Sequence, residues 1–242
     1  PEKFSAPRAV PPLRRRRRTI ALSMRAGVDT GGTFTDFVFW DGRRLRAAKR
    51  PSTPGDPARA VVEGLDAALE ELVHGSTVAT NALLERRGAR TAFVATAGFE
   101  DLLELARQNR ASLYDWFAAA PAPLIPPELR FGLAERMDWR GTPLAEPTAE
   151  AIHEAAERVA ASGAESVAVC LLHAYANPAH ERAVGEALRG RGLAVSLSHE
   201  ILPVYREYER ASTTAVNAYV SPKMAGYLGA LADRLGAATR LR

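Results

Sequence analysis

The chain has 242 residues, of which 47% are hydrophobic and 25% charged, a balance typical of a globular protein with a buried core. No apolar run approaches the roughly 20 residues that a membrane-spanning helix needs, so we expect no membrane association. The formal net charge is +4, but residues 1–23 hold seven basic residues and one acidic residue, which leaves the remainder at −2. This mildly acidic body lacks the basic footprint of a nucleic-acid-binding protein.

The single cysteine, Cys170, cannot form a disulfide within this chain and favours a reducing compartment, so we expect a cytoplasmic protein. We interpret its thiol as buried and inert, because it lies in a strongly apolar, strand-like run over 166–172. Residues 1–23 are rich in Arg and Pro and lack periodicity, which predicts a disordered extension with Met24 as the natural start. An arm that binds RNA or an acidic surface is the alternative.

A glycine-rich stretch, Gly27–Asp36, comes next and leads through an apolar run into the turn dipeptide Asp41-Gly42. This pattern predicts a strand, a phosphate-sized loop and a second strand paired as a hairpin. Paired glycines let backbone N–H groups approach an anion, threonines add hydroxyl donors, and two carboxylates suit a hydrated Mg²⁺. The candidates are Asp29, Thr30, Gly31, Gly32, Thr33, Thr35 and Asp36. The alternative is a glycine-rich hairpin with an acidic rim.

We expect a third strand over 43–50 and then a helix with Asp56 as N-cap and Pro57 as first residue, continuing to Leu72. A second helix, capped by Ser76 or Thr77, follows His74-Gly75 and ends at Gly88. The N-terminus of a helix favours an anion or a developing oxyanion. Residues at this position are His74, Gly75, Thr77, Thr80 and Asn81. The alternative is a helix cap with an incidental histidine.

Residues 90–96 form a predicted strand, and a helix over 99–106 ends in Arg107-Gln108-Asn109-Arg110, either a solvated edge or a corner that faces substrate. Prolines then make 111–130 an irregular connection. From Phe131 onward, strands alternate with helices at 148–163 and 179–189 around an apolar strand at 166–172. This alternation predicts parallel strands joined by right-handed crossovers. His173 and His180 lack a third ligand at metal spacing, which argues against a metal site.

The last segment is expected to hold a loop over 198–203, a helix from about Tyr205 to Val220, and a final helix that starts at Pro222, with no further strand. Glu207, Arg210, Thr214 and Asn217 share one face of the first of these helices at i, i+3 and i, i+4 spacing. The stripe is consistent with a functional surface or with an ion pair between Glu207 and Arg210 that serves only the helix.

Six motifs occur in a fixed order along the chain: Asp29–Asp36, His74–Ala82, Arg107–Arg110, Tyr175–Glu181, Arg206–Arg210 and Asn217–Pro222. Over about residues 24–238 the chain resembles the N-terminal region of the hydantoinase A / 5-oxoprolinase family, which also includes acetone carboxylase subunits. The resemblance implies an α/β fold: an actin-like, ribonuclease-H-type ATPase half with a mixed sheet, whose first hairpin is antiparallel, and a second subdomain of βαβα type.

The resemblance also implies ATP and Mg²⁺ as cofactors and the opening of a cyclic amide or imide, in which ATP phosphorylates the amide oxygen before water attacks. The glycine-loop residues would bind the nucleotide, with Asp29 and Asp36 at the Mg²⁺ ion. Candidate catalytic residues are His74, Asn81, Arg107, Asn109, Glu207 and Arg210. Candidate substrate-binding residues are Gly75, Thr77, Thr80 and Gln108.

The implied partners are a hydantoinase A-type C-terminal half, which carries the second phosphate loop and the adenosine contacts, and a hydantoinase B-type subunit. The chain would be incomplete without that half. Two other departures from the family are a missing strand before His74 and the presence of Ala95 and Ala97 where polar residues are usual. A ketone carboxylase subunit and a truncated, inactive subunit-interaction module are the alternative functions. We expect subdomains at 24–110 and 131–242, joined by 111–130.

Overall fold

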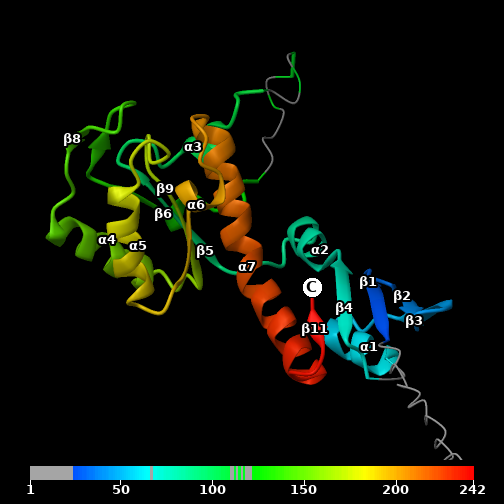
Figure 1. The fold of residues 1–242 in the computed structure, drawn as a ribbon. Helices are drawn as coiled ribbons and strands as arrows, with labels where there is room; N and C mark the ends of the chain where they lie inside the picture. The colour runs from blue at the N-terminus through cyan, green and yellow to red at the C-terminus, as the bar shows by residue number, and fades with distance from the viewer. Residues whose placement is uncertain (1–23, 66–67, 110–111, 113, 116, 118–121) are drawn as a thin grey trace, which may run out of the picture.

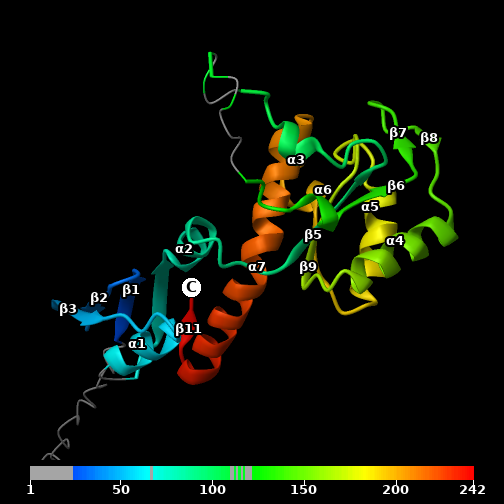
Figure 2. The same cartoon turned by 180° about the vertical axis from the view of Figure 1, so that it is seen from behind.

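The computed structural model describes residues 24–65, 68–109, 112, 114–115, 117 and 122–242. The predicted disordered extension, residues 1–23, lies outside the described residues, as does Arg110. Two β-sheets lie on either side of one long helix, α7 (Glu207–Leu235), as Figures 1 and 2 show. Among the described residues, no helix combines the length and the apolar character needed to cross a bilayer.

The first sheet is mixed and has five strands in the order β11-β4-β1-β2-β3. Its strands are β1 (Arg25–Thr30), β2 (Phe34–Trp40), β3 (Leu45–Pro51), β4 (Glu71–Ser76) and β11 (Arg240–Leu241). The β1–β2 and β2–β3 pairs are antiparallel, whereas β4 runs parallel to β1 and β11 runs parallel to β4. The predicted antiparallel first hairpin and third strand are therefore confirmed.

The core of this sheet lies on one face only, because β2 alternates between buried and exposed residues. Phe37 and Phe39 point inward and pack with Val61 of α1 (Pro57–Gly64) and with Leu231 of α7. Asp56 caps α1 through its side chain, which accepts a hydrogen bond from the Arg59 N–H, and Pro57 is the first helical residue, as predicted.

The second sheet has four parallel strands in the order β10-β9-β5-β6. They are β5 (Thr91–Thr96), β6 (Arg130–Leu133), β9 (Ser166–Cys170) and β10 (Ala194–Leu197). Helices α4 (Ala149–Ala161) and α5 (Ala179–Arg189) pack on one face, and small residues of α7 such as Ala211 and Ala215 pack on the other. The predicted alternation of strands and helices from residue 131 onward is confirmed.

Short elements complete the fold. They are α2 (Val78–Leu84), α3 (Leu102–Leu105), a 3-10 turn η1 (Pro127–Leu129), the hairpin strands β7 (Arg136–Met137) and β8 (Pro143–Ala145), and α6 (Ser198–Ile201). Helix α2 ends before the predicted Gly88, and α3 covers only part of the predicted 99–106. One helical turn, α6, occupies the predicted loop 198–203.

The predicted helix 56–72 is wrong in its second half. The chain leaves α1 at Gly64, Leu65 is extended, and β4 begins at Glu71, so the strand that we judged missing is present. Leu69 and Leu72 remain buried in the same core, because β4 returns alongside β1. Their apolar spacing reflects burial by the sheet rather than a helix face.

Two predictions about the end of the chain are also wrong. Helix α7 continues through Pro222 as one element instead of two, and the chain does form a further strand, β11. Near the proline, the Tyr219 carbonyl accepts a hydrogen bond of 2.9 Å from the Ala89 N–H. This contact lies in the last turn before Pro222, where the missing proline N–H weakens the helical ladder.

The division of the strands between the two sheets does not follow their order along the chain. Strand β5 precedes the Pro-rich connection but belongs to the second sheet, and β11 comes last but belongs to the first. The second sheet is therefore inserted between α2 and the final strand of the first sheet, and α7 carries the chain back (Figure 1).

Candidate functional site

The glycine loop joins β1 to β2 and is held in place by Ser52. The Gly31 N–H donates to Phe34 O at 3.0 Å, while the Ser52 hydroxyl donates to Gly31 O at 2.8 Å and lies 2.9 Å from the Thr35 hydroxyl. A Cβ at Gly31 would lie 3.1 Å from Phe34 O, so this turn suits glycine. Thr35 is fully buried and forms a hydrogen bond with Ser52, so it supports the loop from the buried side of the sheet. Sequence reasoning missed Ser52 because the segment looked like an ordinary loop.

The His74–Asn81 motif lies directly beside the glycine loop. Strand β4 pairs with β1 so that Gly75 is opposite Asp29 and Ser76 is opposite Thr30. The Thr77 N–H and hydroxyl both approach Thr30 O, at 3.2 and 3.4 Å, and the Asn81 amide donates to the Thr77 hydroxyl at 3.3 Å. A Cβ at Gly32 would lie 3.4 Å from Asn81 Nδ2. Two motifs that are distant in sequence thus form one polar surface, on which Thr80 is also exposed.

Asp29 and Asp36 occupy directly opposite positions of the β1–β2 ladder, so their side chains share the exposed face of the sheet. Lys49 on β3 forms an ion pair of 3.2 Å with Asp36. A hard cation such as Mg²⁺ takes carboxylate, water and phosphate oxygens, and two neighbouring carboxylates fit that preference. No cluster of three or more metal-binding side chains occurs in the described part of the chain, so such a cation would need ligands beyond these two.

His74 lies on the inner side of the same sheet and contacts α7. Its Nε2 atom lies 2.5 Å from the Tyr227 hydroxyl and 3.3 Å from the Thr30 hydroxyl. Burial lowers the pKa of His74 below its ordinary value of 6.5, and the nearby Asp29 carboxylate offsets part of this effect. The imidazole is therefore neutral at neutral pH, and its Nε2 atom shares a hydrogen bond with the hydroxyl of Tyr227, whose own pKa is raised by burial. The sequence places Tyr227 in the predicted final helix and gives no sign of its contact with His74.

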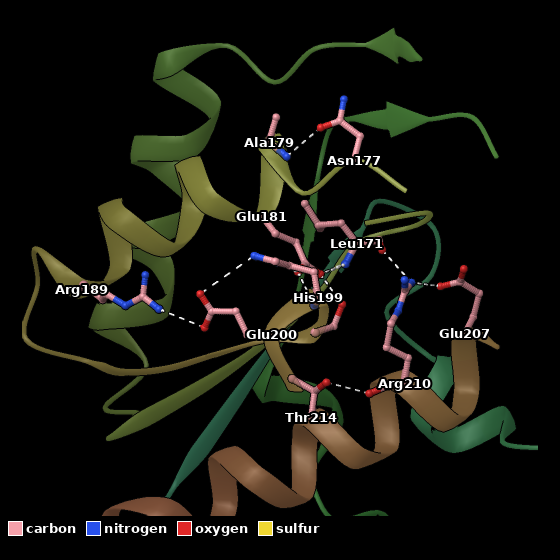
Figure 3. A network of polar contacts seen from close by, with 11 residues as sticks. Leu171, Asn177, Ala179, Glu181, Arg189, His199, Glu200, Glu207, Arg210 and Thr214 are labelled. Carbon is pink, nitrogen blue, oxygen red and sulfur yellow. Dashed lines mark hydrogen bonds and ion pairs between the residues drawn. The ribbon is translucent and has the colours of Figure 1, made fainter. Parts of the chain in front are cut away.

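The remaining predicted residues gather at the other end of α7, where Figure 3 shows Arg210 between Leu171 and Glu207. Arg210 is fully buried and donates through Nη2 to Leu171 O at 2.8 Å and to the Glu207 carboxylate. Arg107 pairs with Glu209 through its Nε atom at 2.8 Å. Gln108 and Asn109 are exposed in the loop after α3.

A buried polar network that sequence reasoning missed supports this second group. The Glu181 carboxylate accepts from the Leu171 N–H at 2.9 Å, from the Ser198 hydroxyl at 2.6 Å and lies 2.7 Å from His199 Nδ1 (Figure 3). Glu135 contacts the Thr96 hydroxyl and lies 2.7 Å from His180 Nδ1. These residues are far apart in sequence, and only the parallel sheet brings them together. His180 and Glu181 end the Tyr175–Glu181 motif, but no local pattern indicates their bonding partners.

Cys170 lies next to this second group, close to Arg210 and Glu181. It is buried, and burial raises the pKa of its thiol to about 12 despite the nearby Arg210 guanidinium. The predicted burial of Cys170 is confirmed, and its raised pKa keeps the thiol protonated at neutral pH.

Comparison with known proteins identifies the family of this chain. A model of the hydantoinase/oxoprolinase N-terminal region matches residues 25–192, which is more than half of the chain. The chain belongs to the hydantoinase/oxoprolinase family. The match includes both the glycine loop and the His74–Asn81 motif, and it confirms the resemblance inferred from the six motifs.

Two solved structures and one curated relative illustrate the family. The caprolactamase subunit alpha of Pseudomonas jessenii is 34% identical over 235 residues, which cover 88% of this chain and 34% of that protein. The crystal structure of the ATP-dependent caprolactamase from the same organism matches with a TM-score of 0.75 and 32% identity, covering 90% of this chain and 35% of that one. The nucleotide-free structure of acetone carboxylase matches with a TM-score of 0.77 and 26% identity, covering 87% and 34%.

The chain spans about a third of the length of three curated relatives and about a fifth of the length of the 5-oxoprolinases that it matches. Within this hydantoinase/oxoprolinase-family region, the predicted residues form two groups and not one. The glycine loop, His74, Thr77 and Asn81 lie together, but Arg107, Glu207 and Arg210 do not join them. Tyr227 touches the first group and Arg210 belongs to the second. They are 17 positions apart on α7, which corresponds to about 25 Å.

Proposed function

We propose that this chain is the phosphate-binding N-terminal part of an ATP-dependent enzyme that opens a cyclic amide or imide. The observation that carries the proposal is the contact between the glycine loop and the His74–Asn81 motif, made through Thr77 and Thr30. Names of relatives such as ATP-dependent caprolactamase support the reaction class. Activity of the whole enzyme would require the rest of a longer protein.

The strand order supports an actin-like, ribonuclease-H-type scaffold. Three antiparallel strands followed by two that run parallel to the first, in the order β11-β4-β1-β2-β3, are the arrangement expected for one half of such an ATPase. In this scheme the Asp29–Asp36 hairpin is one of two phosphate loops. The second loop and the adenosine contacts would come from a hydantoinase A-type C-terminal half, and a hydantoinase B-type subunit would be the further partner.

ATP would supply the phosphoryl group that turns an amide oxygen into a good leaving group. The chain's own residues would prepare that step. The N–H of the exposed Gly32 would meet a phosphate oxygen, since the Gly31 N–H is engaged by Phe34 O. Asp29 and Asp36 would hold Mg²⁺ through direct or water-mediated contacts. Asn81 and Thr77 would orient groups beside the loop, and neutral His74 would fix Thr30 from the inner side of the sheet. We place Gly75 and Thr80 at the rim of the same surface.

A second candidate keeps this scaffold but changes the substrate to a ketone that is carboxylated. The TM-score of 0.77 to acetone carboxylase favours it. Phosphate release measured over a panel of lactams, imides and ketones, with and without bicarbonate, separates the two. Release that depends on a ketone together with bicarbonate would replace the amide hydrolase by the carboxylase.

The glycine at position 32 offers a direct test. In the longer protein assembled with its partner subunit, we expect Gly32→Ala to reduce lactam-dependent ATP hydrolysis at least about tenfold, which corresponds to roughly 1.4 kcal/mol. The added Cβ fits beside Asn81 at an ordinary contact distance of 3.4 Å, so the fold is preserved while the approach of an anion is blocked. Gly55→Ala is the matched control, because nothing lies within 4 Å of its Cβ. Equal losses in both variants, or no loss at Gly32, would contradict a phosphate-binding role for this loop.

A further inference from the structure

Strand β3 is an uncovered edge of the first sheet. It is the terminal strand in the order β11-β4-β1-β2-β3, and it lies at the outer margin of the molecule in both views (Figures 1 and 2). All seven of its residues except Ala48 are exposed. The backbone groups on its outer side therefore have no strand to pair with among the described residues, and such a row can pair with another extended chain.

The two ends of the β2–β3 ladder show which backbone groups of β3 point outward. The Asp41 N–H donates to Arg44 O, and the Ser52 N–H donates to Thr33 O, so both of these pairs are hydrogen-bonded. Hydrogen-bonded and non-hydrogen-bonded pairs alternate along an antiparallel ladder. The even-numbered residues of β3 consequently bond to β2. The N–H and C=O groups that face the open side belong to Leu45, Ala47 and Lys49.

This edge lacks the usual protections against the addition of a strand. Natural edge strands are commonly short, bulged, interrupted by proline or guarded by charges. The register between β3 and β2 is continuous over all seven residues, and Pro51 stands only at the end. Of the three outward-facing residues only Lys49 is charged, and an ion pair of 3.2 Å with Asp36 holds it to the sheet. The edge is therefore open to an extended segment of suitable charge.

The charge of this segment determines which chain it can accept. Residues 43–50 hold five basic residues and no acidic one, and inclusion of Asp36 and Asp41 still leaves +3, although residues 24–242 together carry −2. A second copy would place one basic run opposite another, and residues 1–23 are themselves strongly basic, so both of these occupants are repelled. An acidic segment is attracted instead.

The two faces of β3 differ in polarity. Directly opposite residues of paired strands have their side chains on the same face. Leu45 is opposite Trp40, on a face where Trp40 and Val38 remain 39% and 47% exposed. The alternate positions, on the other face, include Arg44 and Arg50. A strand added to β3 would thus place every second side chain beside apolar neighbours and the remaining ones beside arginines.

We propose that β3 binds, by antiparallel strand addition, an extended segment of a partner protein in which acidic and apolar residues alternate. Backbone hydrogen bonds to the three outward-facing residues would supply the affinity. Apolar side chains of the partner would extend the row that contains Leu45 and Trp40, and its acidic side chains would pair with Arg44 and Arg50. The proposal does not rest on the ATP-dependent reaction, so each can fail alone.

The test uses the 242-residue chain and the labelled peptide Glu-Val-Glu-Val-Glu-Val-Glu, which is as long as β3. We expect saturable binding by fluorescence anisotropy. By NMR, amide hydrogen exchange should slow at Leu45, Ala47 and Lys49 but not at Ala48, whose N–H already bonds to β2. Binding without this protection would locate the peptide on another basic segment and overturn the proposal.

A second peptide separates strand pairing from attraction between charges. N-Methylvaline in place of valine keeps all charges and side chains, but it removes the N–H groups that would donate to β3. We expect this peptide to bind at least about tenfold more weakly, because several backbone hydrogen bonds are lost. Equal binding of the two peptides, or tighter binding of octauridylate RNA at β3, would contradict strand addition by an acidic protein segment.

Variants of β3 complete the test. Ala47→Pro removes one outward N–H and leaves the ladder to β2 intact, since proline is tolerated at such edge positions. We expect at least about tenfold weaker peptide binding, whereas the matched control Ala47→Ser should bind normally. Circular dichroism verifies that both are folded. Normal binding by folded Ala47→Pro would refute the proposal.

The contribution of charge is measured with paired substitutions. Arg44→Gln combined with Arg50→Gln should weaken binding of the acidic peptide about fivefold. Arg140→Gln combined with Arg182→Gln is the matched control, because both residues are exposed outside the first sheet and the change in net charge is the same. Equal losses in the two double variants would show that only the net charge of the chain attracts the peptide, against a site at β3.

Discussion

At the scale of single residues, His74 shows how burial sets chemistry. Its imidazole is wedged between Thr30 and Tyr227, and burial lowers its pKa. A histidine in this state carries no charge at neutral pH. It therefore contacts Thr30 and Tyr227 as a neutral group, and its protonation would place a charge in a partly buried site.

This state predicts a pH dependence of stability. Because the folded pKa of His74 lies below 6.5, the unfolded chain binds a proton first as the pH falls, and the free energy of unfolding decreases below about pH 6.5. We expect His74→Asn to show a smaller decrease between pH 7 and pH 5 in urea titrations, with Asp29 and Tyr227 unchanged. His153→Asn, at an exposed histidine, is the control and should follow the unaltered chain. Parallel curves for all three proteins would refute a buried, neutral His74.

At the scale of elements, the sequence predicts correctly those helices and strands whose positions depend on neighbouring residues. The first hairpin, the Asp56–Pro57 helix start and the buried strand β9 all follow from neighbouring residues. The boundary between α1 and β4 could not be predicted, because Leu69 and Leu72 have the spacing of a helix face and become buried only through pairing with β1. The two-residue strand β11 likewise has no sequence pattern of its own.

The candidate site divides in the same way. The glycine loop and the His74 motif could be recognised because their residues are contiguous in sequence. Tyr227 and Ser52 were missed, and the partners of Glu181 could not be predicted, because each of these residues acts through a distant element. That Arg210 lies far from the glycine loop also depends on the path of α7, which the expected break at Pro222 obscured.

Helix α1 packs its last residue, Gly64, directly against the Phe37 ring. A Cβ at Gly64 would lie 2.1 Å from that ring, so we expect Gly64→Ala to lower the free energy of unfolding by about 1–3 kcal/mol. Chemical denaturation measures this loss, with Gly55→Ala as a control that adds a Cβ into open space. A Gly64→Ala variant as stable as the control would mean that the Phe37 ring can move aside without cost.

At the scale of the whole molecule, strand β11 completes the sheet that begins with β1. The Arg240 N–H donates to Glu70 O and the Arg242 N–H to Leu72 O, both at 2.9 Å, while the His74 N–H donates to Arg242 O at 2.8 Å. Removing β11 would therefore expose the edge of β4 next to the candidate site.

We expect deletion of residues 239–242 to cost about 2–3 kcal/mol of stability, since each of three backbone hydrogen bonds contributes about 1 kcal/mol. Amide hydrogen exchange at His74 should accelerate, because its N–H loses its acceptor. Arg240→Gln retains the backbone and should leave this exchange rate unchanged. Slow exchange at His74 after the deletion would show that β11 does not protect the edge.

The late return of β11 also bears on how the molecule folds during synthesis. The second sheet is complete by Leu197, whereas the first sheet waits for α7 to bring Leu231 to its core and Arg240 to its edge. Chains are made from the N-terminus, and closing a long loop costs more entropy than closing a short one. The inserted sheet should thus mature first on the ribosome, and the glycine loop, although translated at the start, would acquire its final support last.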